Sequence, residues 1–162
     1  HDREGFAMTT EQLKAWLLEY MPLKLETENR REHLKRLKAC AELPPAREYD
    51  GSQHTRSSGE RMALAVERYT EYEKEIRPYI AANEHRMQAI RAAISAIPDP
   101  MEREVLRLRY TDGDCYRPLP WKEVAANLYG GCAQRHVDAT NRLHRKALAH
   151  LSQQITEAPQ HE

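Results

Sequence analysis

An apolar stripe with heptad spacing runs through the middle of the sequence and restricts the fold more than any other feature. The stripe advances in alternating steps of four and three residues over five heptads, the pattern of a long helix that packs along one seam. Pro78 lies within it, where we expect a kink or break costing roughly 3 kcal/mol if unrelieved. The stripe comprises Met62, Val66, Tyr69, Glu73, Ile76, Ile80, Asn83, Met87, Ile90, Ile94 and Ile97.

Two partners could cover this seam. A helix expected over residues 22–43 could fold back on it as an intramolecular hairpin, or a second copy of the chain could pair with residues 60–97 as a homodimer. The polar seam residues Glu73 and Asn83 could fix the register or the oligomeric state of either arrangement. At the level of the sequence both alternatives stay open.

The composition also favours long helices. Ala, Glu, Lys, Leu and Arg make up about half of the 162 residues, whereas Gly is scarce and β-branched runs are absent. The 25 Lys and Arg residues balance the 25 Asp and Glu residues, so the chain lacks the high net charge of a disordered protein. No apolar run reaches the ~18 residues of a membrane span, no secretory signal peptide is recognised, and three cysteines suggest no disulfide framework. We therefore expect an all-α protein of the cytoplasm.

The N-terminal region, residues 8–98, is expected to form a helical hairpin or coiled coil. Residues 1–7 resemble the remnant of an expression tag. Thr10 is a suitable N-cap for a first helix, and Pro22 suits the first position of a second helix. Two prolines at positions 44 and 45 end that helix, and the polar segment 44–59 predicts a mobile loop.

A second helical region is expected over residues 99–155. Asp99, Pro100 and Glu102 have the spacing of a capping box, with Asp as the N-cap of a helix. Asp112-Gly113 is expected to end that helix. Its expected inward-facing residues are Met101, Val105 and Leu108.

The remainder of this region predicts a short helix, a glycine turn and a longer helix. The short helix covers residues 121–128 and carries Ala125, which is small enough for a second helix to cross it closely. Gly130 or Gly131 permits a positive φ at the turn. The last helix is expected over about residues 132–155, and residues 156–162 are expected to be a disordered tail. This order of elements is the helix-turn-helix arrangement, whose second helix enters the DNA major groove.

The side chains on the outer face of the last helix have the chemistry of DNA recognition. Gln and Asn can pair bidentately with adenine, and Arg with guanine or phosphate. Residues 132–152 carry a net charge of +3, to which protonation of His136, His144 and His150 would add. The alternative is an ordinary amphipathic helix with a solvated charged face. The predicted DNA-binding residues are Gln134, Arg135, Asp138, Asn141, Arg142, Arg145 and Lys146.

Residues 99–151 resemble region 4 of bacterial sigma factors. The resemblance rests on MEREVLRLRY in the first helix, WKEVAANL in the short helix and NRLHRKALAHL in the last. A charged helical region ahead of such a module is similar to the RinA/ArpU-like phage and prophage late-gene activators. The resemblance implies a transcriptional regulator that binds promoter DNA beside RNA polymerase. Eleven residues separate Ala125 from Val137, more than in the family, so a longer turn or a shifted recognition helix is expected.

Other functions fit the sequence less closely. A phage DNA-packaging subunit of the small-terminase type also joins a helix-turn-helix to oligomerisation helices, but in the reverse order. A helical adaptor could contact RNA polymerase without touching DNA. The basic segment 30–38 could contact DNA backbone, although pairing with the acidic segment 67–75 is favoured.

No catalytic site, cofactor or metal is expected. The sequence lacks the glycine-rich motifs that cradle nucleotide phosphates. Cys132 and His136 are one helical turn apart, but even with Cys115 and His144 the spacing is not that of a zinc site. We therefore expect a non-enzymatic protein whose partners are double-stranded DNA and RNA polymerase.

Overall fold

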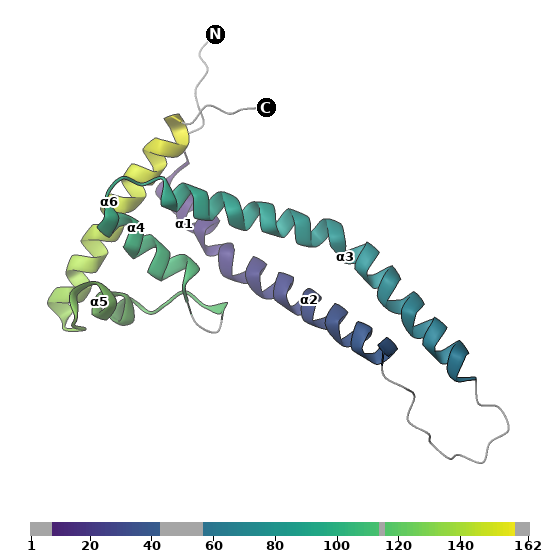
Figure 1. The fold of residues 1–162 in the computed structure, drawn as a ribbon. Coiled ribbons are helices and arrows are strands. Elements are labelled where there is room, and N and C mark those ends of the chain that lie inside the picture. Colours follow the sequence, from purple (N-terminus) through teal and green to yellow (C-terminus); the bar gives the residue numbers. More distant parts are fainter. Residues whose placement is uncertain (1–7, 43–56, 114–115, 158–162) are drawn as a thin grey trace, which may run out of the picture. The chain divides into compact units, whose positions relative to one another are not determined.

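The computed structural model describes residues 8–42, 57–113 and 116–157, and these residues are helical with short connections. The prediction of an all-α protein is confirmed, because no described residue lies in a β-strand. None of the described helices has the length and apolarity needed to cross a membrane. In chain order (Figure 1) the elements are α1 (Thr10–Leu18), α2 (Tyr20–Glu42), α3 (Ser58–Ser95), α4 (Pro100–Leu106), the π-helical turn η1 (Arg107–Thr111), α5 (Trp121–Tyr129) and α6 (Gln134–Glu157).

Three expected boundaries in the N-terminal part of the chain shift in the structure. The N-cap of α1 is Thr9 instead of Thr10, and it forms a reciprocal capping box with Gln12. α2 begins at Tyr20, so Pro22 is its third residue instead of its first. The N–H groups of the first four residues of a helix have no acceptor within that helix, so the N–H that proline lacks costs α2 no hydrogen bond. α3 begins at Ser58, within the expected loop 44–59, and it continues through Pro78. The expected tag remnant, most of that loop and the end of the expected tail lie outside the described residues, although Thr156 and Glu157 belong to α6.

The described residues form two compact units. The first contains the residues before position 26 and after position 84, and the second contains residues 26–84. α2 and α3 therefore each contribute to both units. This division differs from the expected boundary at residue 98, because the core of the first unit takes side chains from both sides of that position.

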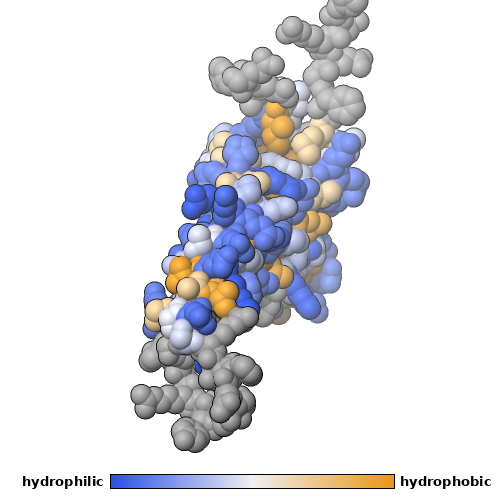
Figure 2. Space-filling view, turned by 90° about the vertical axis from the view of Figure 1, so that its right-hand side faces the viewer, coloured by the Kyte–Doolittle hydropathy of each residue, from blue (hydrophilic) through white to orange (hydrophobic). Residues whose placement is uncertain are grey.

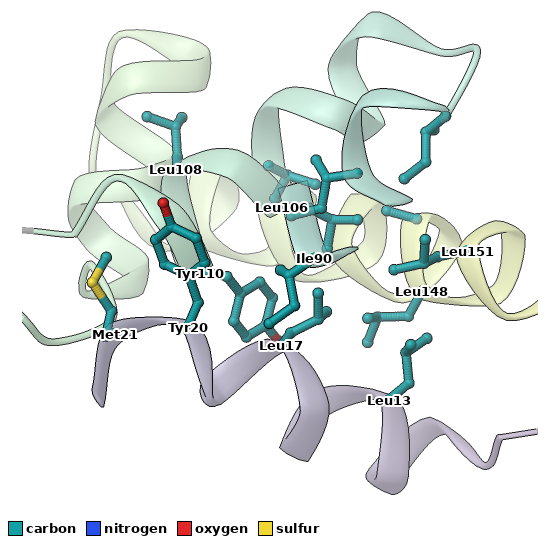
Figure 3. Packing of buried hydrophobic residues seen from close by; sticks show 14 of the residues in the cluster. Leu13, Leu17, Tyr20, Met21, Ile90, Leu106, Leu108, Tyr110, Leu148 and Leu151 are labelled. Carbon is teal, nitrogen blue, oxygen red and sulfur yellow. The ribbon is translucent and has the colours of Figure 1, made fainter. Parts of the chain in front are cut away.

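The core of the first unit brings α1 and the end of α3 together with the C-terminal helices. Leu13 and Leu17 of α1 point toward Leu148 and Leu151 of α6 (Figure 3), and all four are at most 1% exposed. The second half of the heptad stripe, from Met87 to Ile97, is buried in the same cluster. Full burial of each such aliphatic side chain contributes about 1.5–3 kcal/mol. Helices from both halves of the chain therefore stabilise one core.

The start of α4 is capped as expected, but one member of the expected capping box has another role. The Asp99 carboxylate accepts hydrogen bonds from the backbone N–H groups of Met101 and Glu102, at 2.8 and 3.2 Å. The Glu102 side chain does not return the bond; it is 1% exposed and faces α6. Met101 was expected to face inward, but it is 40% exposed, because the packing face of this short helix is formed by Val105 and Leu106.

In the second unit, α2 and α3 are antiparallel neighbours. The Asn83 amide donates to a Glu26 carboxylate oxygen at 3.3 Å, and farther along the pair the His33 and Tyr72 rings meet edge to face at 4.7 Å. Intramolecular contacts thus cover the middle of the heptad stripe, where Ile76 is 1% exposed. At its beginning, Met62 remains exposed.

Candidate nucleic-acid interface

α5 packs against α6 and buries two of its side chains. Val124 and Ala125 are fully buried, and α5 lies against the first half of α6 (Figure 1). An alanine at the crossing lets two helix backbones approach, because no longer side chain separates them. The expected close contact at Ala125 is consistent with its burial.

The connection between α5 and α6 depends on a glycine with left-handed backbone geometry. Gly130 has φ 72° and ψ 13°, and its N–H donates to the Ala126 carbonyl at 2.9 Å, which ends α5. Gly131 is constrained by space instead, since a Cβ atom there would lie 2.6 Å from the His136 ring. That ring stacks on Tyr129 with a centroid separation of 6.5 Å. α6 then begins at Gln134, two residues later than expected.

One stripe of α6 is buried, and the opposite side is open. The buried positions are spaced by three and four residues, as an amphipathic helix requires. Val137, Leu143 and Ile155 are half-buried at the edges of this stripe. The fully buried members are Thr140, His144, Ala147, Leu148 and Leu151.

Most of the predicted DNA-binding residues lie together on the open side of α6. Asn141 is half-buried and the others are exposed. Arg135 and Arg142 form no ion pair with any described residue, so their guanidinium groups are available to a ligand. The amide of Gln134 donates to an Asp138 carboxylate oxygen at 2.9 Å, which orients both side chains at the start of the helix. The exposed members are Gln134, Arg135, Asp138, Arg142, Arg145 and Lys146.

Lys146 has a different environment from the arginines. Its Nζ lies 3.8 Å from Oε1 of the buried Glu102, while Nδ1 of His150 lies 2.7 Å from Oε2 of the same carboxylate. Glu102 Oε1 has no hydrogen-bond partner among the described residues. Glu102 thus ties α4 to the C-terminal half of α6, and Lys146 stands at the edge of the open face. This pairing could not be predicted from local spacing, because Glu102 has the spacing of a capping residue.

A buried cluster of polar and aromatic side chains packs against the buried side of α6. The Tyr110 hydroxyl and His144 Nε2 share a hydrogen bond of 2.8 Å, and Trp121 meets the His144 ring edge to face at 4.7 Å. The Arg109 guanidinium lies 4.4 Å from the Trp121 ring centroid, and it donates to the Leu119 carbonyl at 2.6 Å. These contacts connect η1, the loop before α5, α5 and α6.

Burial determines the charge states in this cluster. Desolvation, with the nearby charges of Lys14 and Arg109, lowers the pKa of His144 to about 4. Burial likewise raises the pKa of Tyr110 to about 12. His144 is therefore neutral at pH 7 and adds no positive charge to α6, whereas its protonation would have added to the net charge of +3 on residues 132–152. The buried stripe of α6 includes this position, which explains the difference.

The second basic segment, residues 30–38, is largely neutralised within its own unit. Arg30 pairs with Glu26 at 3.1 Å, Arg31 with Glu84 at 2.5 Å and Lys38 with Glu73 at 3.7 Å. Arg36 is 3.9 Å from Glu32. These contacts fit a solvated, paired helix face, although Glu73 is the only partner among them from the expected acidic segment 67–75.

The described residues contain no group of three or more His, Cys, Asp and Glu side chains arranged to hold a metal. Cys115, one of the considered ligands, lies outside the described residues, and Cys132 is exposed. The open side of α6 carries amide groups and positive charge. Comparison with known proteins adds no assignment: no protein-family model matches the chain, and neither a curated protein nor a solved structure matches it.

Proposed function

We propose that the chain is a sequence-specific DNA-binding regulator of transcription, with α6 as its recognition helix in a sigma-region-4-like helix-turn-helix. The observation that supports this most is the open face of α6. Unpaired arginines and hydrogen-bonding amides gather there, opposite a stripe buried against α4 and α5.

The spacing of the exposed residues suits base recognition. Arg135 and Arg142 are seven residues apart, which is about 10 Å along a helix. This distance corresponds to about three base steps of B-DNA at 3.4 Å per step. Each arginine can bind guanine O6 and N7 bidentately, and Gln134 or Asn141 can bind adenine N6 and N7. Asp138 can accept from cytosine N4 and disfavours a phosphate at its position.

The cellular role that we propose follows from the resemblance to sigma region 4 and to RinA/ArpU-like activators. The chain would act in the cytoplasm at promoters of a phage or prophage, with RNA polymerase as a protein partner and without catalytic activity of its own. The other helices position α6: α4, η1 and α5 hold its buried side through Glu102, Tyr110 and Trp121.

A binding measurement with charge-matched variants tests the proposal. Fluorescence anisotropy with labelled duplex DNA compares the wild type with Arg135→Ala/Arg142→Ala and with the control Arg68→Ala/Arg77→Ala, which removes two exposed arginines from α3. We expect the first variant to lose at least about tenfold in affinity, because each bidentate arginine–guanine contact contributes about 1–3 kcal/mol. Equal affinities for the two variants, or no salt-dependent DNA binding by the wild type, would overturn it.

A further inference from the structure

A cavity lies between the C-terminal end of α3 and α4, and all of its lining residues belong to the first unit. Its volume is about 450 Å³, within the range of about 300–1,000 Å³ that is typical of small-molecule sites. Most of the face shown in Figure 2 is hydrophilic, with apolar side chains in small groups, as is normal for a protein surface. The residues that line the cavity include Tyr20, Arg91, Ile94, Pro100, Arg103 and Arg107.

The cavity lies on the side of α4 that faces away from α6. Pro100, Arg103 and Glu104 line it, whereas Glu102 and Val105 are buried. At 100° per residue these two sets of side chains point to opposite sides of the helix. The buried set includes Glu102, whose carboxylate contacts α6. The cavity is therefore separate from the open face of α6.

The inner wall of the cavity is apolar, and the backbone at one edge has an unusual form. Tyr20 and Ile94 line the cavity although they are only 6% and 4% exposed, so they form its inner wall. Arg107 and Thr111, the two ends of the π-helical turn η1, line another part. Single π-helical turns are rare, and they occur frequently at functional sites. An apolar wall beside a few polar groups is the usual composition of a small-molecule site.

Two of the three arginines at the cavity lack a carboxylate partner. Arg107 pairs with both Glu104 and Asp112, and these two carboxylates also line the cavity. Arg91 and Arg103 form no ion pair with any residue that the structure describes. The charged groups at the cavity that lack an internal counter-charge are therefore both positive, which favours an anionic ligand.

Internal hydrogen bonds hold both of these guanidinium groups in place. Nη1 of Arg91 donates to the Tyr20 hydroxyl at 3.0 Å. Nη1 of Arg103 donates to the carbonyls of Ile97 and Pro98, at 2.7 and 3.1 Å. The Nε–H and Nη2 groups of Arg103 have no acceptor within the described ranges. This edge of a guanidinium can bind a carboxylate or a phosphate through two parallel hydrogen bonds.

We propose that this cavity binds a small organic anion, with an apolar or aromatic body and one carboxylate or phosphate group. The anionic group binds the Nε and Nη2 edge of Arg103, and Arg91 supplies a second positive charge at the cavity. The apolar body lies against Tyr20 and Ile94, where it loses water. This site does not rest on the proposed DNA-binding role, because it lies on the other side of α4 from α6.

NMR titration of the isotope-labelled full chain tests the site with simple probes. Phenyl phosphate and benzoate are the anionic probes, and benzyl alcohol is the neutral control. We expect at least one anion to bind with a millimolar dissociation constant, as is usual for ligands of this size, and to shift the arginine Nε–H signal of Arg103. Benzyl alcohol should bind at least about tenfold more weakly, because it leaves both guanidinium groups without a counter-charge. The tighter of the two anions identifies the preferred anionic group.

Three variants complete the test. Arg103→Gln removes the bidentate edge, and Arg91→Gln removes the second charge at an exposed position where circular dichroism should show unchanged helix content. We expect each to weaken binding of the anion about tenfold. Arg77→Gln, an exposed change on α3 outside the cavity, is the matched control and should bind as the wild type does. Binding of neither anion by the wild type, equal binding of benzyl alcohol, or wild-type affinity in either cavity variant would each overturn the proposed site.

Discussion

The Nε2 atom of His144 in α6 lies 2.8 Å from the hydroxyl oxygen of Tyr110 in η1, and both side chains are buried. The two residues are 34 positions apart, and their hydrogen bond joins the helix that carries the open face to the element behind it. Because η1 continues directly from α4, this bond links α6 to the start of the C-terminal helices.

The buried histidine makes the stability of the first unit depend on pH. Its pKa falls from 6.5 to about 4 on folding, so between these values the unfolded chain binds more protons than the folded chain. The contribution of neutral His144 to the free energy of unfolding is therefore complete above pH 6.5, and it is lost as the pH falls toward 4. We expect a loss of about 3 kcal/mol from this residue.

Urea unfolding between pH 7 and pH 4 checks this expectation with two variants. In His144→Gln the extra loss of stability on acidification should disappear, whereas His85→Gln, at an exposed position, should behave as the wild type. Identical pH profiles for the wild type and His144→Gln would show that the histidine is not the titrating group.

The buried carboxylate of Glu102 should depend on His150. Removal of His150 in His150→Ala leaves Glu102 with only Lys146, at 3.8 Å, and we expect a loss of about 1–3 kcal/mol in the free energy of unfolding. His85→Ala is the matched control, since His85 is exposed. Equal stabilities of the two alanine variants at pH 7 would refute a stabilising pair.

Residues 99–157 should not fold as an independent domain. The fragment lacks Leu13, Leu17, Ile90 and Ile97, all fully buried in the shared core, so it would expose the apolar side of α6. We expect the fragment to unfold in urea without a cooperative transition and to bind the dye ANS. A chain of residues 8–157 should unfold cooperatively and should not bind ANS. A cooperative transition of the short fragment would contradict the shared core.

Gly130 should tolerate a side chain poorly. At φ 72° an alanine is strained by roughly 1–2 kcal/mol, although space is available around its Cβ position. We expect Gly130→Ala to lose that amount in urea unfolding and to weaken DNA binding, because the entry into α6 shifts. Gly59→Ala, within a helix and also without steric conflict, is the control and should be neutral or stabilising. A fully stable Gly130→Ala would mean that the turn does not require this geometry.

Local patterns in the sequence predicted the helices of the C-terminal region well. Asp99 caps α4, Gly130 ends α5 with a positive φ, and Ala125 is buried on α5, as the local patterns indicated. These features depend on residues close together in the sequence, so their spacing can be read from the sequence alone.

Contacts between distant segments could not be predicted in the same way. Glu102 has the sequence position of a capping residue, but its carboxylate contacts the distant His150 instead of the backbone at the start of α4. The heptad stripe similarly predicted one continuous seam from Met62 to Ile97. In the structure its second half, from Met87, is buried in the core of the first unit, its middle is covered by α2, and Met62 is exposed. Only tertiary packing determines which partner each turn of a long helix meets.

The most direct test of the proposed DNA-binding role is selection of duplexes bound by the full chain from a random pool, at a low and a moderate salt concentration. We expect one recurrent motif in the wild-type selection at both concentrations, containing a guanine that the Arg135→Ala variant no longer selects. The charge-matched control Arg77→Ala should select the wild-type motif. Recovery of no motif at either salt concentration, or of the same motif from all three proteins, would contradict recognition of DNA sequence by the open face of α6.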